Sequence, residues 1–194
     1  MYHRYESQCF VLSSYPEKEA NRSYVIFSRD LGLISAKAQG VALSASKLRG
    51  NLEAPSKVSL SLVKGKEVWR IVGVQAENNL WLDLKSNREG LALFTRLANL
   101  VKRMVQGEER HEELFLVLEE CALALQEKVT KEDLLALELV LVSKLLHHLG
   151  YFKLKEEYEE FFNKTLSEID SKKILSMRRY LVADINRALK ESHL

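Results

Sequence analysis

The sequence has few cysteines and prolines and no long apolar run, and each scarcity excludes a class of protein. Its 194 residues include 2 Cys and 2 Pro. Cys9 and Cys121 each lie in an apolar run, so both are expected to be reduced core thiols rather than a disulfide. Without a CxxC pair there is no four-cysteine zinc site. No stretch approaches the ~20 apolar residues of a membrane span, and residues 1–6 lack the apolar run of a signal peptide. We therefore expect a cytoplasmic protein that does not associate with membranes.

The short motifs of common catalytic sites are also missing. Lys64-Gly65-Lys66 lacks the flanking spacing of a phosphate-binding P-loop, and no GxSxG nucleophile motif occurs. His147 and His148 are adjacent, so on a helix their side chains point in different directions and do not readily share one metal ion. We therefore expect a protein that is not an enzyme and that holds no metal or other cofactor.

What the sequence does contain is a large apolar fraction and an uneven distribution of charge. Apolar residues make up 46% and charged residues 29%, which is typical of a folded domain with a buried core. The net charge is only +2, but residues 1–80 hold 11 Lys and Arg against 7 Asp and Glu, whereas residues 81–194 hold 18 against 20. The N-terminal part is therefore the better candidate for binding a polyanion.

Residues 1–80 are predicted to form strands. Short apolar or β-forming runs occupy residues 8–14, 22–29, 33–38, 57–62 and 68–74, and in residues 57–62 apolar and polar side chains alternate. Glycine-containing turns at residues 30–32 and 64–66 separate neighbouring strands. Five short strands, with one longer polar connection after the third, favour a small closed β-barrel of the OB type, and an open sheet is the alternative.

From residue 81 onward the apolar period becomes helical. Helices are expected over residues 91–105, 112–128, 130–149, 151–164 and 172–190. Ser86 with Glu89 and Thr130 with Asp133 have the spacing of capping boxes. The third helix is apolar around nearly its whole circumference, which predicts that it lies at the centre of a bundle. The expected fold is α+β, with an OB-type barrel domain over residues 1–80 and an all-helical domain over residues 81–194.

The basic residues of the predicted barrel are the main functional signal. Residues 29–70 hold 8 Lys and Arg against 3 Asp and Glu. Many of these charges alternate with apolar residues, so they share outward positions on strands and can follow a phosphate backbone. The candidate DNA-binding residues are Arg29, Lys37, Lys47, Arg49, Lys57, Lys64, Lys66 and Arg70. Tyr24, Phe27 and Trp69 either stack on bases or fill the barrel core, and the sequence leaves both readings open.

Several short motifs resemble, in their order and spacing, those of the RecO family of bacterial recombination mediators. They are Phe10-Val11-Leu12, Phe27-Ser28-Arg29-Asp30-Leu31-Gly32, Ala38-Gln39-Gly40, Ser46-Lys47-Leu48-Arg49-Gly50 with Leu52, and Leu145-Leu146-His147-His148-Leu149-Gly150-Tyr151. Many relatives carry a zinc-binding, cysteine-containing segment after the last of these motifs. Residues 152–173 contain no cysteine, which makes this a short form without that zinc site.

The resemblance implies a non-enzymatic role in recombinational DNA repair. It implies an OB domain that binds single- and double-stranded DNA, anneals complementary strands and contacts single-strand-binding protein. It also implies that the protein helps RecR to load the RecA recombinase, so that it is associated with the nucleoid.

Two other functions stay open. Gln39 and the uncharged residues 42–45 stand where relatives carry basic residues, and residues 81–194 are acidic overall. These features favour a protein-interaction adaptor of the same fold with weak or no DNA binding. An RNA-binding OB protein is the third interpretation, because composition does not distinguish the two nucleic acids.

Overall fold

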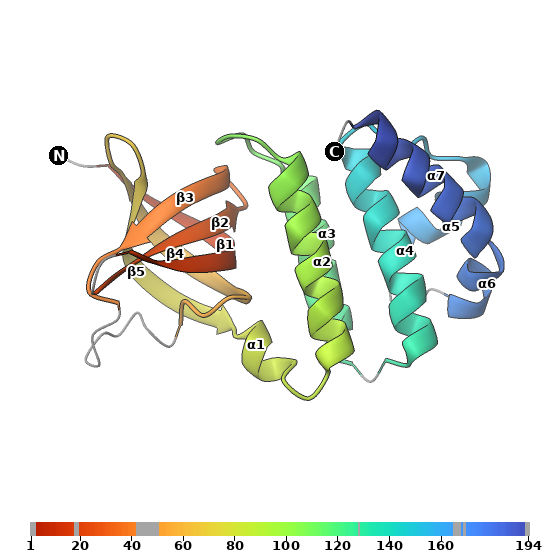
Figure 1. Cartoon of the computed structure of the whole chain (residues 1–194), viewed down its shortest axis with the longest axis horizontal. Helices are drawn as coiled ribbons and strands as arrows, with labels where there is room; N and C mark the ends of the chain where they lie inside the picture. Colours follow the sequence, from red (N-terminus) through yellow and green to blue (C-terminus); the bar gives the residue numbers. More distant parts are fainter. Residues whose placement is uncertain are drawn as a thin grey trace. The chain divides into compact units, whose positions relative to one another are not determined.

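The computed structural model of the chain describes residues 3–17, 20–41, 51–127, 129–164, 168 and 170–192. The chain divides into two compact units, and Figure 1 shows strands in the first and helices in the second. The first unit contains residues 1–86 and 105–115, and the second contains residues 87–104 and 116–194. The domain boundary at residue 80 stays a prediction from the sequence. Residues 105–115 belong to the same compact unit as the strands, although their sequence has no strand pattern.

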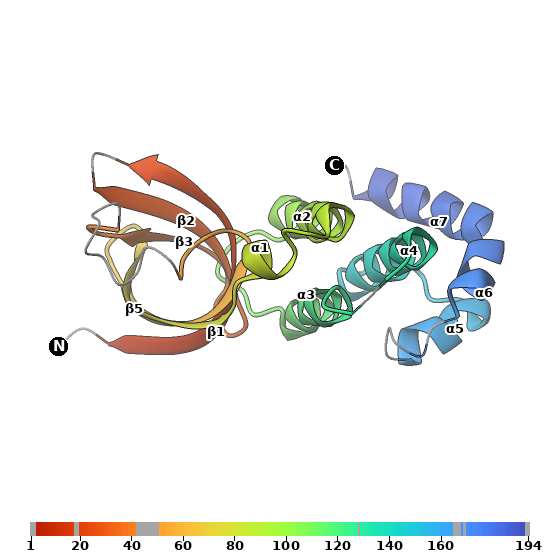
Figure 2. The same cartoon turned by 90° about the horizontal axis from the view of Figure 1, so that it is seen from below.

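Five strands close into a barrel in the order β1-β2-β3-β5-β4. They are β1 (Arg4–Glu17), β2 (Asn21–Ser28), β3 (Gly32–Ala38), β4 (Ser56–Lys64) and β5 (Trp69–Asn78). The long strand β1 pairs with both β2 and β4, and a short parallel pairing of β3 with β5 completes the closure (Figure 2). This is the arrangement of an OB-type barrel, so the predicted α+β fold class is confirmed and the open sheet is wrong.

Alternating side chains fill the barrel because successive residues of a strand point to opposite faces. Tyr24 and Ile26 of β2, Ile34 of β3, and Leu60 and Leu62 of β4 are all buried in one cluster. Val41 and Leu52, which flank residues 42–50, belong to the same cluster. Charged residues such as Lys37 and Arg70 take outward positions between inward residues of this cluster, although the apolar Val25 and Phe27 of β2 also point outward.

The second unit is built around one helix. Its elements are α2 (Arg88–Met104), most of α3 (Glu112–Ala124), α4 (Lys131–His148), α5 (Glu156–Asn163), α6 (Ser171–Ser176) and α7 (Arg178–Glu191). The helix α4 contacts α2, α5, α6 and α7, and Leu141 near its middle is fully buried. The predicted central position of this helix is confirmed, and so is its capping box, in which Thr130 and Asp133 bond each other's backbone N–H groups.

Local details of the helices differ from the prediction. Asn87, not Ser86, caps α2, because its side-chain oxygen accepts a 2.8 Å hydrogen bond from the Gly90 N–H. The predicted last helix is two helices, since Met177 closes α6 with hydrogen bonds to two preceding carbonyls before α7 begins. A short helix, α1 (Leu80–Asp83), follows β5 and was not predicted. Within the described ranges, every helix is too short or too polar to span a bilayer.

Candidate nucleic-acid interface

The eight predicted DNA contacts do not form one face. Lys47 and Arg49 lie outside the described residues. Of the other six, Lys57 is near the start of β4 and Lys64 is at its end. Seven residues at about 3.3 Å each separate these two by roughly 23 Å along the strand. The six described residues therefore lie in two separate groups, one near Lys57 and one near Lys64.

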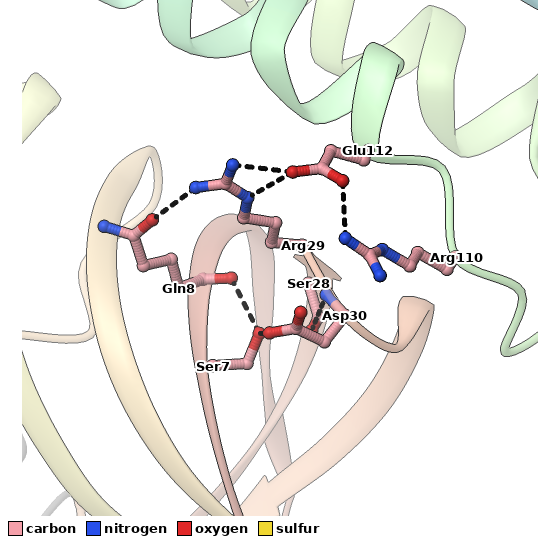
Figure 3. Close-up of polar contacts among 7 residues, drawn as sticks. All are labelled: Ser7, Gln8, Ser28, Arg29, Asp30, Arg110 and Glu112. Atoms are coloured by element: carbon pink, nitrogen blue, oxygen red, sulfur yellow. Dashed lines mark hydrogen bonds and ion pairs between the residues drawn. The ribbon is translucent and has the colours of Figure 1, made fainter.

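The first group contains Arg29, at the turn after β2. Its Nη2 and Nε donate to Glu112 Oε1 at 2.6 and 3.0 Å, and its Nη1 donates to Gln8 Oε1 at 3.3 Å (Figure 3). Arg110 donates to the other oxygen of Glu112 at 2.5 Å. Hydrogen bonds from Arg29 and then Arg110 hold the pKa of the Glu112 carboxyl below its usual range. Glu112 therefore stays charged and opposes any phosphate that approaches Arg29.

Lys57 is held in the same way by Glu77. Its Nζ lies 3.1 Å from Glu77 Oε2, and Gln8 Nε2 donates to both oxygens of that carboxylate at 3.3 Å. Burial raises the pKa of Glu77, but hydrogen bonds from Ser59, Lys57 and Gln8 outweigh it and leave the pKa lowered. Gln8 thus links the Arg29 and Lys57 clusters, and both basic side chains are largely neutralised by carboxylates.

A hydroxyl network fixes the turn that carries Arg29. Ser28 Oγ donates to Ser7 Oγ at 2.9 Å, and Ser7 Oγ donates to Asp30 Oδ2 at 2.6 Å (Figure 3). Ser28 Oγ also accepts from the backbone N–H groups of Asp30 and Leu31. These bonds tie β1 to the β2–β3 turn, which indicates a structural role for this part of the predicted site.

The second group is the one that faces solvent. It consists of Lys37 on β3, Lys64 at the end of β4, Lys66 in the β4–β5 turn and Arg70 on β5, and is called here the β3–β5 basic surface. Lys37 and Arg70 lie directly opposite each other in the parallel β3–β5 pairing. In OB folds the sheet face that includes β3 and the β4–β5 turn are the usual sites of oligonucleotide binding. This surface therefore has the position expected of a nucleic-acid interface.

The four cations of the β3–β5 basic surface differ in how far they are compensated. Lys37 forms an ion pair with Glu17. Lys64 lies 2.7 Å from Glu108 and 5.3 Å from the centre of the Trp69 ring. Lys66 and Arg70 are exposed, and no described residue forms an ion pair with either. Lys66 and Arg70 are therefore the candidates most available to a phosphate.

The aromatic residues singled out in the sequence are not available for stacking. Tyr24 and Trp69 are buried in the barrel cluster. Phe27 points outward from the barrel, but Phe115 covers it, with ring centres 6.3 Å apart, and Phe10 packs on Phe115 at 4.9 Å. The prediction that these aromatics fill the barrel core is confirmed for Tyr24 and Trp69, whereas Phe27 is buried outside the barrel; with all three buried, their proposed role as stacking platforms is wrong.

Sequence reasoning missed one exposed aromatic side chain on the barrel. Tyr15 of β1 lies opposite Ser23 of β2, Ser23 lies opposite Lys37 of β3, and Lys37 lies opposite Arg70 of β5. Tyr15, Ser23, Lys37 and Arg70 thus form a transverse row on the outer surface. The predicted first strand ended at Ser14, three residues before the end of β1 at Glu17. Cys9 and Val11 point inward, so unbroken alternation would have placed Tyr15 inside the barrel; the register shift between Val11 and Ser13 turns Tyr15 to the outer face.

Segment 105–115 contributes carboxylates to both groups. Glu108 accepts hydrogen bonds from Lys64 at 2.7 Å and from the Trp69 indole N–H at 2.9 Å, and Glu112 binds Arg29. The hydrogen bond from Lys64 is the main cause of the lowered pKa of Glu108. These acidic side chains occupy positions at which a phosphate would otherwise contact the same cations.

The residues considered for metal binding or catalysis lie in ordinary structural surroundings. His147 Nδ1 is 3.0 Å from the Phe152 carbonyl oxygen, and its ring lies against Phe162. In the part of the chain that the structure describes, no three His, Cys, Asp or Glu side chains gather as a metal site. Cys9 and Cys121 are free and buried, as predicted, and burial raises the pKa of the Cys9 thiol to about 12. A thiol of that pKa is a poor nucleophile near neutral pH.

Comparison with known proteins gives consistent matches. Residues 1–80 match the family described as recombination protein O N terminal. The chain is 30% identical over 148 residues to the DNA repair protein RecO of Dechloromonas aromatica (strain RCB), and the aligned region covers 73% of this chain and 57% of the relative. It is 32% identical over 151 residues to the DNA repair protein RecO of Nitrosospira multiformis, which covers 76% and 59%. The RecO protein of Gloeothece citriformis is 29% identical over 131 residues, which covers 67% and 46%. The chain thus spans about half the length of the curated relatives it matches.

Proposed function

Because this chain belongs to the RecO family, we propose that it acts in recombinational DNA repair by binding single- and double-stranded DNA. In this role it anneals complementary strands and, with RecR and single-strand-binding protein, helps to load a RecA-type recombinase. It acts without catalytic residues or a cofactor. The barrel domain supplies the DNA contacts, and the helical domain supplies surfaces for protein partners.

The observation that supports DNA binding most directly is the β3–β5 basic surface. Lys66 and Arg70 are exposed there without a carboxylate partner among the described residues, and Lys37 lies beside Arg70. Cations on an open strand face neutralise backbone phosphates without reading base edges. Such contacts suit annealing, which requires that the base edges stay free to pair.

The remaining candidates contribute in different measure. Arg29 and Lys57 stay predicted contacts, but a phosphate must compete with Glu112 and Glu77 for them. The Arg29 pair is partly exposed, so competition from Glu112 reduces that contact without preventing it, whereas the Lys57 pair is mostly buried and its contact is the harder one to make. Lys47 and Arg49 also stay predicted contacts, and their connection between β3 and β4 begins near Lys37 in the sequence.

The test is a binding titration of fluorescein-labelled DNA, followed by anisotropy at low salt. Wild type should bind both a single strand and a duplex, and Lys66→Ala with Arg70→Ala should weaken both. Lys172→Ala with Lys190→Ala is the matched control, because it removes the same charge from exposed positions on α6 and α7. Equal losses in the two double variants would show that only net charge matters and that the surface is misplaced. A labelled RNA strand in the same titration separates a DNA protein from an RNA-binding one.

The adaptor is the second candidate function, and a specific observation favours it. Arg29, Lys37, Lys57 and Lys64 each form an ion pair with a glutamate. These pairs reduce the positive potential that the eight basic residues suggest. If wild type does not bind DNA even at low salt, the adaptor becomes the better account.

A further inference from the structure

Tyr15 is the one aromatic side chain of the transverse row, and it is accessible. Its exposed fraction is 54%, against 1% for Tyr24 and 3% for Trp69. Directly opposite residues on neighbouring strands share one face, so Tyr15, Ser23, Lys37 and Arg70 line up across the outer surface of four strands. With strands about 4.8 Å apart, Tyr15 lies about 14 Å from Arg70. The row therefore presents a phenol ring at one end and two cations at the other.

The charged side chains along this row are Glu17, Lys37 and Arg70, and they differ in how far an anionic ligand can use them. Glu17, two residues further along β1, forms an ion pair with Lys37 and accepts a 3.0 Å hydrogen bond from Ser23 Oγ. This contact places Glu17 beside the middle of the row and largely neutralises Lys37. Arg70 remains as the exposed cation of the row, with Lys66 in the turn that leads to it. A ligand on this row therefore gains from phosphate contacts at the Arg70 end and needs another source of affinity at the Tyr15 end.

We propose that Tyr15 is a base-stacking platform that makes this surface prefer single-stranded to double-stranded DNA. The inference rests on the proposed function and adds a specificity-determining residue to it. Every base has a π-face that stacks on an aromatic ring, so the contact does not depend on sequence. The bases of a duplex are already stacked and paired inside it, and only an unpaired strand can place a base on Tyr15 while its phosphates reach Arg70.

An exposed tyrosine by itself is an ordinary surface feature. Trp81 shows the difference, since it belongs to the same unit and is 48% exposed. It lies on α1, just after Asn78, and Asn78 pairs with Lys57 rather than with the row. Trp81 therefore has the chemistry of a stacking platform without the aligned cations, and it serves as the matched control for Tyr15.

The experiment compares Tyr15→Ala, Tyr15→Phe and Trp81→Ala in the full chain, each checked for an unchanged thermal melt. Affinity is measured by anisotropy for a labelled single strand of about 20 nucleotides, longer than one OB-fold site, and for the same strand in a duplex. Tyr15→Ala should weaken single-strand binding at least about fivefold and duplex binding by less than about twofold, since stacking contributes roughly 1–3 kcal/mol per base. Tyr15→Phe keeps the ring and should bind like wild type, and Trp81→Ala should change neither affinity.

The outcomes separate this inference from the function on which it rests. Wild type that binds neither form of DNA overturns the proposed function and the stacking role together. If wild type binds the single strand and the duplex, but Tyr15→Ala leaves the two affinities unchanged or weakens them equally, the stacking role alone is overturned. A loss in Tyr15→Phe as large as that in Tyr15→Ala would also overturn it, because the hydroxyl and not the ring would then make the contact.

Discussion

Gly32→Ala tests how segment 105–115 is attached to the barrel. Gly32 begins β3 with φ at 71°, and a Cβ atom built on it would lie 1.9 Å from the Glu109 carbonyl oxygen. The left-handed backbone conformation costs a non-glycine residue about 1–2 kcal/mol. Pushing the Glu109 backbone aside adds about 1–3 kcal/mol, the usual cost of an overpacked site. We expect Gly32→Ala to lower the free energy of unfolding of the first unit by about 2–5 kcal/mol in total.

Gly107→Ala is the matched control for this substitution. Gly107 has φ at 79°, but a Cβ atom there would meet nothing within 4 Å. It should therefore cost only the backbone term of about 1–2 kcal/mol. The difference between the two variants isolates the contact between the β3 turn and segment 105–115.

Urea unfolding followed by tryptophan fluorescence measures both variants. The Trp69 indole donates to Glu108, so displacing the segment should also alter Trp69 emission in folded Gly32→Ala. Folded Gly107→Ala should keep the wild-type spectrum. Equal losses of stability, with both spectra unchanged, would refute the close packing of Glu109 on Gly32.

Three further predictions follow from buried, titratable and paired side chains. Leu141→Asp puts a carboxylate at a fully buried position of α4 and should unfold the second unit, which circular dichroism melting detects; a soluble variant with an unchanged melt would contradict the central position of α4. The lowered pKa of Glu108 means that its bond to Lys64 stabilises the fold above the ordinary pKa of 4.5 and is lost as pH falls through the folded-state pKa. Glu108→Gln should therefore lower the free energy of unfolding at neutral pH, and this free energy should fall less steeply below about pH 4.5 in urea titrations. If the variant loses stability with falling pH as steeply as wild type, other carboxyls cause the loss. Glu17→Gln releases Lys37 from its ion pair and should tighten DNA binding in an anisotropy titration, and weaker binding would exclude Lys37 as a phosphate contact.

The barrel could be predicted from the sequence because its information is local. Apolar and polar residues alternate along β4, and that period places Leu60 inside. Along β2 successive side chains also alternate between the two faces, and Tyr24 and Ile26 share the inner one. The same alternation places Phe27 outside, where stacking on bases was a reasonable interpretation. Phe115, from far along the chain, covers Phe27 instead. A tertiary contact of this kind leaves no trace in the local pattern.

The candidate site could be predicted only in part, for the same physical reason. Residue types and alternation identified Lys66 and Arg70 as outward cations, and the structure agrees. Ion pairs such as Lys64 with Glu108 join residues from separate segments, so counting charges along the chain overestimated the free positive charge. The alignment of Tyr15 with Arg70 depends on three strand pairings, whose register is fixed only in the folded barrel.

The salt dependence of single-strand binding tests the central claim most directly. If Lys66 and Arg70 each contact a phosphate, wild type should lose affinity linearly in a plot of log K against log salt concentration. Replacing both residues with alanine should then reduce the slope by about 1.4, since each contact to a single strand accounts for about 0.7. Lys172→Ala with Lys190→Ala should keep the wild-type slope. A Lys66→Ala, Arg70→Ala variant with unchanged affinity and slope, or wild type that fails to bind at low salt, would contradict DNA binding by the β3–β5 basic surface.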